Sequence, residues 1–257
     1  MRRGQHRDHH GGTVRRERGS WTPAAHQLLA HLESVGFDAA PRVLGVDQDG
    51  FEILTFIDGQ TCGGAAGFPA WARAEENLVR VAGLLRRYRD AVASFRPAPG
   101  TVWRGGRRDL RPGEIIGHND VSLANLVADA GGRVHSLIDW DNAGPTTRRA
   151  DLAYAAWHVV GLNAPAHARA RGWTDQPDVA RRLRIFLDAY GLTDRDGFVD
   201  EICDRIDRAI DEMRAEARRT GVQVDDFVGL LERDIAFIRA NRAELEHAIT
   251  GSAQRAA

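Results

Sequence analysis

The sequence contains no lysine, so all 35 of its Lys and Arg positions are arginine. A GC-rich coding sequence is the simplest cause, because the two residues replace one another on most solvated faces. They differ only at bidentate, stacked or pKa-tuned sites. The absence therefore matters where a site requires a lysine.

Cysteine is scarce as well, and long apolar runs are missing. Cys62 and Cys203 lie far apart in sequence and form no metal-type pair, which is typical of a protein in a reducing cytoplasm. No apolar run approaches the length that a bilayer span needs. The basic N-terminus has no apolar stretch behind it, unlike a secretory signal. We therefore expect a cytoplasmic protein with no membrane partner.

Composition and charge indicate a globular protein that does not bind nucleic acid. Hydrophobic residues make up 43% and charged residues 28% of the 257-residue chain, the balance of a soluble globular protein. The formal net charge of −1 provides no overall attraction for nucleic acid. The length allows one large domain or two small lobes.

The chain is predicted to divide near residue 60, where glycine and small residues interrupt the pattern. Residues 1–12 are basic, rich in glycine and histidine and aperiodic, and are predicted to be disordered. Residues 13–59 are predicted to form a small lobe of strands with one helix. Residues 60–257 are predicted to form a mostly helical lobe, because helical periodicity dominates beyond this point.

The small lobe is predicted to contain a strand, a helix and a hairpin. The strand covers residues 13–16, and the helix starts at Thr22, a good N-cap that is followed by Pro23. Two apolar runs, 41–46 and 51–57, flank the turn residues Asp-Gln-Asp-Gly and are predicted to pair as a hairpin.

The larger lobe is predicted to hold a second hairpin among helices. Residues 69–95 are predicted to form one long amphipathic helix. The apolar runs 125–127 and 134–138 are predicted to pair across a glycine-containing turn. Further helices are expected at about 148–162, 177–190, 195–219 and 224–248.

A catalytic-loop motif precedes the second hairpin. His118, Asp120 and Asn125 have the spacing H-x-D-x-x-x-x-N, which is typical of protein-kinase-like folds. Phosphoryl transfer needs a carboxylate that orients the nucleophile and accepts its proton, and Asp120 is the candidate. It also needs an oxygen ligand for Mg²⁺, and the side-chain amide of Asn125 can provide one. We expect His118 to shape the loop without taking part in a chemical step.

A second carboxylate, Asp139, ends the second strand of this hairpin. A carboxylate at that position can complete a clamp for Mg²⁺ and ATP with Asn125, because magnesium takes few protein ligands and fills its shell from phosphate and water. Asp141 could assist a second metal ion or could be a solvated turn residue.

These motifs resemble those of the aminoglycoside phosphotransferase family, whose relatives include choline, homoserine and methylthioribose kinases. The resemblance rests on GHNDVSLANLV at 117–127, LIDWDNAG at 137–144 and ADLAY at 150–154. It implies an α+β, bilobal protein-kinase-like fold with a short N-lobe and a mostly helical C-lobe. It also implies ATP and Mg²⁺ as cofactors, Asp120 as the catalytic base, and Asn125 and Asp139 as the metal ligands. Asp151 would be a structural residue behind the catalytic loop.

The sequence departs from the family pattern in its N-terminal part. Members of the family hold the nucleotide phosphates with a lysine on a strand and orient it with a glutamate on the next helix. Here Arg16 is the best substitute for the lysine, since arginine can bind phosphate bidentately. The helix position is occupied by His26.

Two further nucleotide contacts are expected from the resemblance. Backbone groups of the segment that joins the lobes, at Thr55, Phe56 and Ile57, are expected to hold the adenine. A strand–loop–strand lid over the phosphates would precede Arg16, but residues 1–12 are too few and too polar to form it. Either the lid is missing or the start of the chain is truncated.

Two functions are consistent with these residues. The first is ATP-dependent transfer of the γ-phosphate to a hydroxyl of a small molecule that is aminoglycoside-, choline- or sugar-like. The alternative is a catalytically weak or inactive kinase-fold protein that binds a small ligand and acts in immunity or regulation. Trp140, Trp157 and His158 could line the substrate cleft, although core packing is the more favoured role for Trp157.

Overall fold

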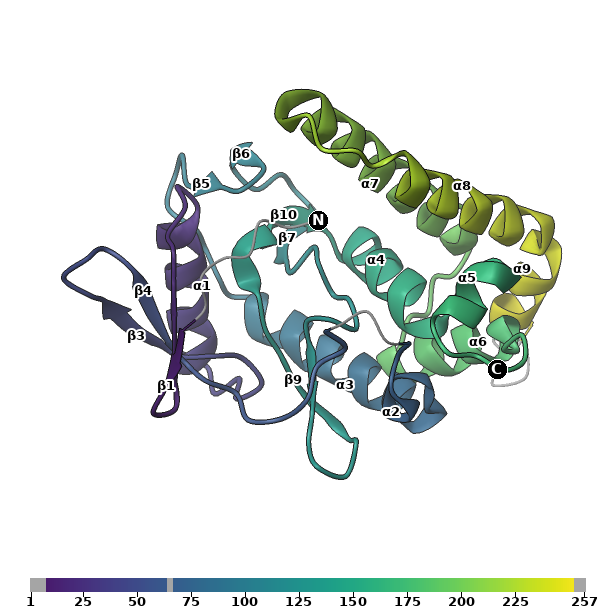
Figure 1. Ribbon diagram of the computed structural model, residues 1–257, viewed down its shortest axis with the longest axis horizontal. Helices are drawn as coiled ribbons and strands as arrows, with labels where there is room; N and C mark the ends of the chain where they lie inside the picture. The colour runs from purple at the N-terminus through teal and green to yellow at the C-terminus, as the bar shows by residue number, and fades with distance from the viewer. Residues whose placement is uncertain (1–7, 64–66, 252–257) are drawn as a thin grey trace. The chain divides into compact units, whose positions relative to one another are not determined.

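The structure is a computed structural model that describes residues 8–63 and 67–251 (Figure 1). Two units pack separately. The first combines the chain up to Thr61 with Leu84–Asp151, and the second combines Cys62–Gly83 with the chain from Leu152. Both units draw on segments from beyond residue 60, and the division into lobes at 13–59 and 60–257 stays a prediction.

A four-stranded antiparallel sheet lies at the start of the first unit, with strand order β1-β2-β4-β3. The predicted strand and hairpin are confirmed. The four strands are β1 (Asp8–His10), β2 (Thr13–Arg16), β3 (Val43–Val46) and β4 (Glu52–Thr55).

The predicted disorder of residues 1–12 is wrong for residues 8–10, which form β1; residues 1–7 lie outside the described part of the chain. Gly11 and Gly12 both have positive φ, 54° and 83°, and make the tight turn from β1 to β2. A two-residue turn with positive φ suits the twist of paired strands. The hairpin was missed because the polar run of β1 carries no apolar alternation.

Helix α1 (Thr22–Ser34) follows β2. The N-cap is Trp21, so the prediction of Thr22 as N-cap is wrong by one residue. The Thr22 hydroxyl instead accepts a hydrogen bond from the Gly19 amide at 3.0 Å, which fixes the loop before the helix. The helix is anchored by the buried side chains of Leu28, Leu29 and Leu32.

The other strands described in the first unit form three antiparallel pairs. The predicted second hairpin is confirmed as β8 (Leu126–Ala128) and β9 (Val134–Leu137), and Gln60 pairs with Ala128 at its edge. The other pairs are β5 (Val102–Trp103) with β6 (Gly106–Arg107), and β7 (Glu114–Gly117) with β10 (Gly144–Thr147).

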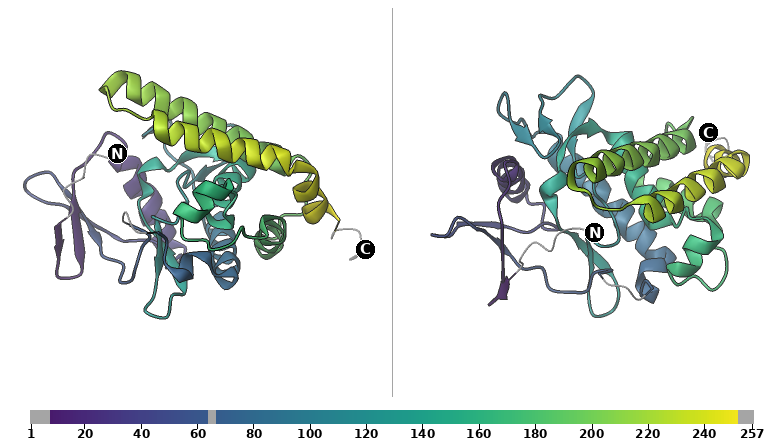
Figure 2. Two further views of the ribbon diagram at one scale, coloured as in Figure 1. Left: turned by 45° about the vertical axis from the view of Figure 1, so that its right-hand side comes forward. Right: turned by 45° about the horizontal axis from the view of Figure 1, so that its top comes forward.

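The second unit is helical. Helices α7 and α8 lie side by side (Figures 1 and 2). The helices are α2 (Ala70–Arg73), α3 (Glu75–Val92, whose residues from Leu84 belong to the first unit), α4 (Arg148–Val160, whose residues up to Asp151 belong to the first unit), α5 (Pro165–Ala170), α6 (Val179–Tyr190), α7 (Phe198–Thr220), α8 (Asp225–Ala240) and α9 (Arg242–Thr250).

Two predicted long helices are each divided in two. The helix predicted at 69–95 breaks at Ala74, whose ψ of 132° is extended, and the Asn77 side chain donates to the Trp71 carbonyl across the break. The helix predicted at 224–248 breaks at Asn241, whose side chain donates to the Phe237 carbonyl. Side-chain amides that compete for helical carbonyls favour such breaks.

A buried polar cluster joins α5 to α8 in the second unit. Asp234 is fully buried, and its carboxylate contacts His167 at 2.6 Å and accepts from Asn163 at 2.8 Å and from the Ala164 amide at 2.7 Å. A buried carboxylate with these partners is satisfied, so the cluster is structural.

In the described part of the chain, no helix has both the length and the apolar character that crossing a membrane requires.

Candidate active site

The catalytic loop is held from behind by Asp151, as predicted. The Asp151 carboxylate accepts hydrogen bonds from the amides of His118 and Asn119, at 3.3 and 2.7 Å. Gly117 lies so close that a Cβ there would collide with the Thr146 methyl and stand 2.9 Å from Cγ of Asp151. The position therefore requires glycine.

Asn119 adopts a left-handed conformation with φ of 61°, which is uncommon for a residue other than glycine. Its side-chain nitrogen donates to the carbonyls of Asn142 and Gly144, both at 3.1 Å. These bonds join the catalytic loop to the segment that follows Asp139 and offset the cost of the backbone conformation.

His118 is a packing residue, as expected. Its Nδ1 accepts from the Asp120 amide at 3.3 Å, and Nε2, which then carries the proton, donates to the Ile138 carbonyl at 3.2 Å. Its ring also packs edge-on against Trp140. Burial of the imidazole lowers the pKa of His118, so the ring is neutral.

Asp120, the predicted catalytic base, is 4% exposed. The side-chain nitrogen of Asn142 donates to its Oδ2 at 2.9 Å, and the side-chain nitrogen of Asn125 donates to its backbone carbonyl at 2.8 Å. The Asn125 amide is thereby oriented through its nitrogen, and its oxygen is the atom that a metal would bind. The role of Asn142 was not predicted.

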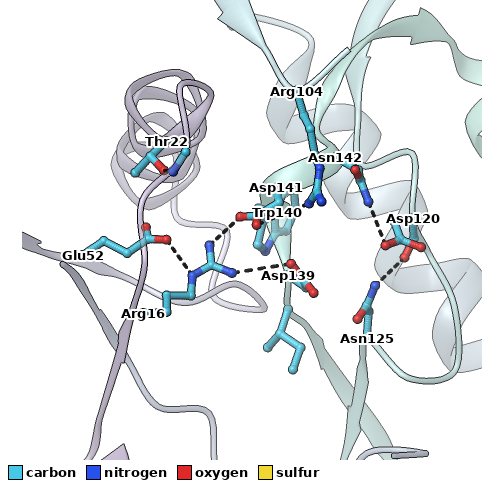
Figure 3. A network of polar contacts seen from close by, with 12 residues as sticks. Arg16, Thr22, Glu52, Arg104, Asp120, Asn125, Asp139, Trp140, Asp141 and Asn142 are labelled. Carbon is cyan, nitrogen blue, oxygen red and sulfur yellow. Dashed lines mark hydrogen bonds and ion pairs between the residues drawn. The ribbon is translucent and has the colours of Figure 1, made fainter. Parts of the chain in front are cut away.

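Asp139, the predicted metal ligand, follows β9 and also has a left-handed backbone, with φ of 65° and ψ of 66°. Non-glycine residues in this region are enriched at functional sites. Figure 3 shows the side chains of Asp139, Asn125 and Asp120 on neighbouring parts of one network, contributed by the loop and by both ends of the β8–β9 hairpin.

Arg16, the predicted substitute for lysine, lies in the same network (Figure 3). Its guanidinium forms ion pairs with three carboxylates: Nε with Glu52 at 2.6 Å, Nη2 with Asp141 at 2.7 Å and Nη1 with Asp139 at 3.4 Å. Burial alone would lower the pKa of Arg16, but the charges of these carboxylates outweigh it and raise the pKa.

Glu52, on β4, pairs with Arg16, whereas the family pattern predicts that a glutamate on the helix pairs with the lysine. Its second oxygen contacts Nε2 of His26 at 2.7 Å, so one carboxylate bridges Arg16 on β2 and His26 on α1. Sequence reasoning missed Glu52. The available signal was its place in an otherwise apolar strand, two residues from the buried Leu54 and therefore on the same face.

Asp141 is 3% exposed, which excludes the solvated-turn alternative. It pairs with Arg16 and, at 3.6 Å, with Arg104 from the β5–β6 hairpin.

Trp140 is 1% exposed and packs against Tyr88, so its predicted role in lining a substrate cleft is wrong. Trp157 is buried too, as the core-packing alternative predicts.

The segment expected to hold adenine continues from β4. The amides of Thr55 and Phe56 donate to the carbonyls of Arg42 and Gly12, at 2.9 and 2.8 Å. These two amides are therefore engaged within the sheet, and a base would have to meet other backbone groups at Thr55, Phe56 and Ile57.

The residues present fit a magnesium ion. Asn125 and Asp139 are 4% and 8% exposed and offer oxygen atoms, the donors that Mg²⁺ prefers. Within the described residues, no group of three or more His, Cys, Asp and Glu side chains could hold a metal by itself. A pair of protein ligands suits magnesium, which keeps several positions for phosphate and water.

Comparison with known proteins supports the family resemblance. Residues 11–186 match the phosphotransferase enzyme family. The chain is 37% identical over 218 residues to the trifolitoxin immunity protein of Rhizobium leguminosarum bv. trifolii, covering 82% of this chain and 80% of that protein.

Solved structures of phosphotransferases share the fold. The GDP complex of wild-type aminoglycoside 2'-phosphotransferase-IIIa has a TM-score of 0.58 at 17% identity, covering 87% of this chain and 86% of that one. Ethanolamine kinase from Plasmodium vivax has a TM-score of 0.55 at 10% identity, covering 90% and 77%. The predicted α+β, protein-kinase-like fold is confirmed.

Proposed function

Because the chain belongs to the phosphotransferase enzyme family, we propose that it transfers the γ-phosphate of ATP to a hydroxyl group of a small molecule. The observation that carries the proposal is the ordered set of Asp120, Asn125 and Asp139, which are buried and held by hydrogen bonds or ion pairs. Family members retain such a set for phosphoryl transfer.

Asp120 is the proposed catalytic base. Its carboxylate orients the acceptor hydroxyl towards the γ-phosphate and takes its proton as the bond to phosphorus forms. The hydrogen bond from Asn142 limits rotation of this carboxylate, which favours one orientation for the acceptor.

Asn125 and Asp139 are the proposed ligands of Mg²⁺. When bound, the ion would neutralise charge on the phosphate oxygens. The segment at Thr55, Phe56 and Ile57 is the proposed adenine contact. Arg16 stays a proposed phosphate contact, but its three ion pairs also support a second role, in which it holds Asp139 and Asp141 in place.

The acceptor is proposed to be aminoglycoside-, choline- or sugar-like, in line with the names of the structural relatives, an aminoglycoside phosphotransferase and an ethanolamine kinase. We place the protein in the cytoplasm, where ATP is available. Among the described residues both cysteines, Cys62 and Cys203, are free, which suits a reducing compartment.

A second candidate function is immunity through binding of a small ligand, with little or no phosphoryl transfer. Its support is the 37% identity to a trifolitoxin immunity protein. The three ion pairs of Arg16 also favour it, because they engage the cation that would otherwise meet the phosphates.

A thermal-shift titration with ATP, with and without Mg²⁺, tests the proposal. A ligand that binds only the folded state raises stability by RT ln(1 + [L]/Kd). We expect a Mg²⁺-dependent shift that Asp139→Ala removes and Asp120→Ala retains. Asp90→Ala, which removes an exposed carboxylate from α3, is the matched control. No shift of the wild-type protein at millimolar ATP would refute the enzyme and favour the immunity function.

A further inference from the structure

Arg104 lies at the tip of the β5–β6 hairpin. Trp103 pairs with Gly106, so Arg104 and Gly105 form a two-residue turn. Trp103 is 3% exposed, and its Cβ lies 3.5 Å from where a Cβ on Gly144 would stand, which anchors the hairpin beside β10. Figure 3 shows the Arg104 side chain reaching from this turn into the network, toward Asp141 and on the side where Asn142 lies.

The Arg104 guanidinium is held loosely by comparison with that of Arg16. Its ion pair with Asp141, at 3.6 Å, is longer than a hydrogen bond, and its side chain is 44% exposed. The Arg16 side chain is 5% exposed, with each guanidinium nitrogen within 3.4 Å of a carboxylate. Arg104 can therefore turn to an incoming anion without breaking a buried ion pair, whereas Arg16 cannot.

Trp21 provides a fixed platform for Arg104. The guanidinium carbon lies 4.6 Å from the centre of the Trp21 ring, within the range of a cation–π contact. The ring itself lies against Gly19, where any Cβ would collide with it. Stacking on an aromatic ring leaves the edge of the guanidinium, with its N–H donors, available to an anion.

On the basis of the proposed function, we propose that Arg104 binds the terminal phosphates of the nucleoside triphosphate. The phosphate oxygens replace Asp141 as its partner and accept hydrogen bonds from its planar edge, while Trp21 retains the stack. A cation from the β5–β6 hairpin thus supplies phosphate contacts in a chain that contains no lysine.

Isothermal titration of ATP, ADP and AMP, with Mg²⁺ present, tests this inference. We expect Arg104→Ala to weaken ATP binding by about tenfold or more, the effect of losing charge-assisted hydrogen bonds. AMP binding should stay within about twofold of the wild type. Trp21→Ala should weaken ATP binding in the same direction but by less. Arg133→Ala is the matched control, since Arg133 is 60% exposed and pairs with Asp129 at the far end of another hairpin.

The outcomes separate the two proposals. If wild-type protein binds ATP and Arg104→Ala binds it equally well, or loses AMP to the same extent, the role of Arg104 is refuted and the proposed function stands. If the wild-type protein binds no nucleotide, the proposed function is refuted, and the role of Arg104, which depends on it, is refuted with it.

Discussion

The side-chain amide of Asn142 donates a hydrogen bond to Oδ2 of Asp120 at 2.9 Å. A residue of the short 3₁₀ helix Trp140–Asn142, which follows the β8–β9 hairpin, thereby restricts the orientation of a carboxylate in the loop that precedes the hairpin. Asn119 reinforces this link, because its side chain binds the carbonyls of Asn142 and Gly144. The proposed catalytic loop and the proposed metal-binding turn are thus connected by side chains of asparagine.

We predict that Asn142→Ala lowers the rate of ATP hydrolysis, measured without added acceptor, by about ten- to hundredfold, because small displacements of a catalytic group have effects of that size. ATP affinity should change little, since Asn142 contacts the base and not the proposed metal ligands. Asn241→Ala, in the second unit, serves as control. If Asn142→Ala hydrolyses ATP at the wild-type rate, Asp120 does not need the hydrogen bond from Asn142.

The Glu52 bridge should be a major contributor to stability. Glu52→Gln leaves Arg16 buried with one negative charge fewer around it and replaces the carboxylate that bridges Arg16 and His26 with a neutral amide. We expect the free energy of unfolding to fall by about 3 kcal/mol, the usual effect of breaking a buried pair. Urea denaturation measures it. Glu33→Gln, at an exposed pair with Arg42, should cost less than about 1 kcal/mol; similar losses for both variants would contradict the prediction.

Below about pH 6.5, protonation of His118 should lower the free energy of unfolding. The folded state lowers the pKa of His118 below its ordinary 6.5, so the unfolded state binds the proton more readily. Protonation of His118 therefore lowers the free energy of unfolding as the pH falls below about 6.5, and this one residue contributes up to about 1.4 kcal/mol per pH unit. Denaturation between pH 7.5 and 5 measures this slope.

Two histidine variants identify the source of this slope. His118→Asn should reduce the slope even though the variant is less stable overall. His135→Gln, at an exposed position, should leave it unchanged. An equal slope in the wild type and in His118→Asn would assign the effect to other groups.

Gly117→Ala should destabilise the protein, because the new methyl group would press on Thr146 and on the Asp151 carboxylate. Overpacking of this kind costs about 1–3 kcal/mol. Gly83→Ala is the matched control: a Cβ at Gly83 would meet nothing within 4 Å. In helix α3 that substitution should stabilise by about 0.5–1 kcal/mol. Thr146→Ser in the Gly117→Ala background should recover part of the loss, and no recovery would place the strain elsewhere.

The sequence predicted those features that depend on local pattern. The spacing of His118, Asp120 and Asn125, and the apolar runs of β8 and β9, are properties of short segments. The apolar runs located the hairpin correctly, and the spacing identified the proposed catalytic loop that precedes it. The position of Arg16 followed from a resemblance to a lysine strand.

The remaining contacts depend on residues that are distant in sequence. Asp141 lies 125 residues from Arg16, and Asn142 lies 22 residues from Asp120. No local periodicity specifies such pairs. The alternation of β4 could have marked Glu52 as buried, but its pairing with Arg16 depends on the register of β2 and β4. Arg104 was missed because its contacts depend on residues elsewhere in the chain. The breaks at Ala74 and Asn241 were missed because helical periodicity continues on both sides of each break.

The left-handed backbone of Asp139 places a conformational cost at a position whose carboxylate also pairs with Arg16. Glycine would relieve a conformational cost of about 1–2 kcal/mol while removing the carboxylate. The same change would break the buried ion pair with Arg16, so the carboxylate of residue 139 stabilises the fold in addition to its proposed role as a metal ligand.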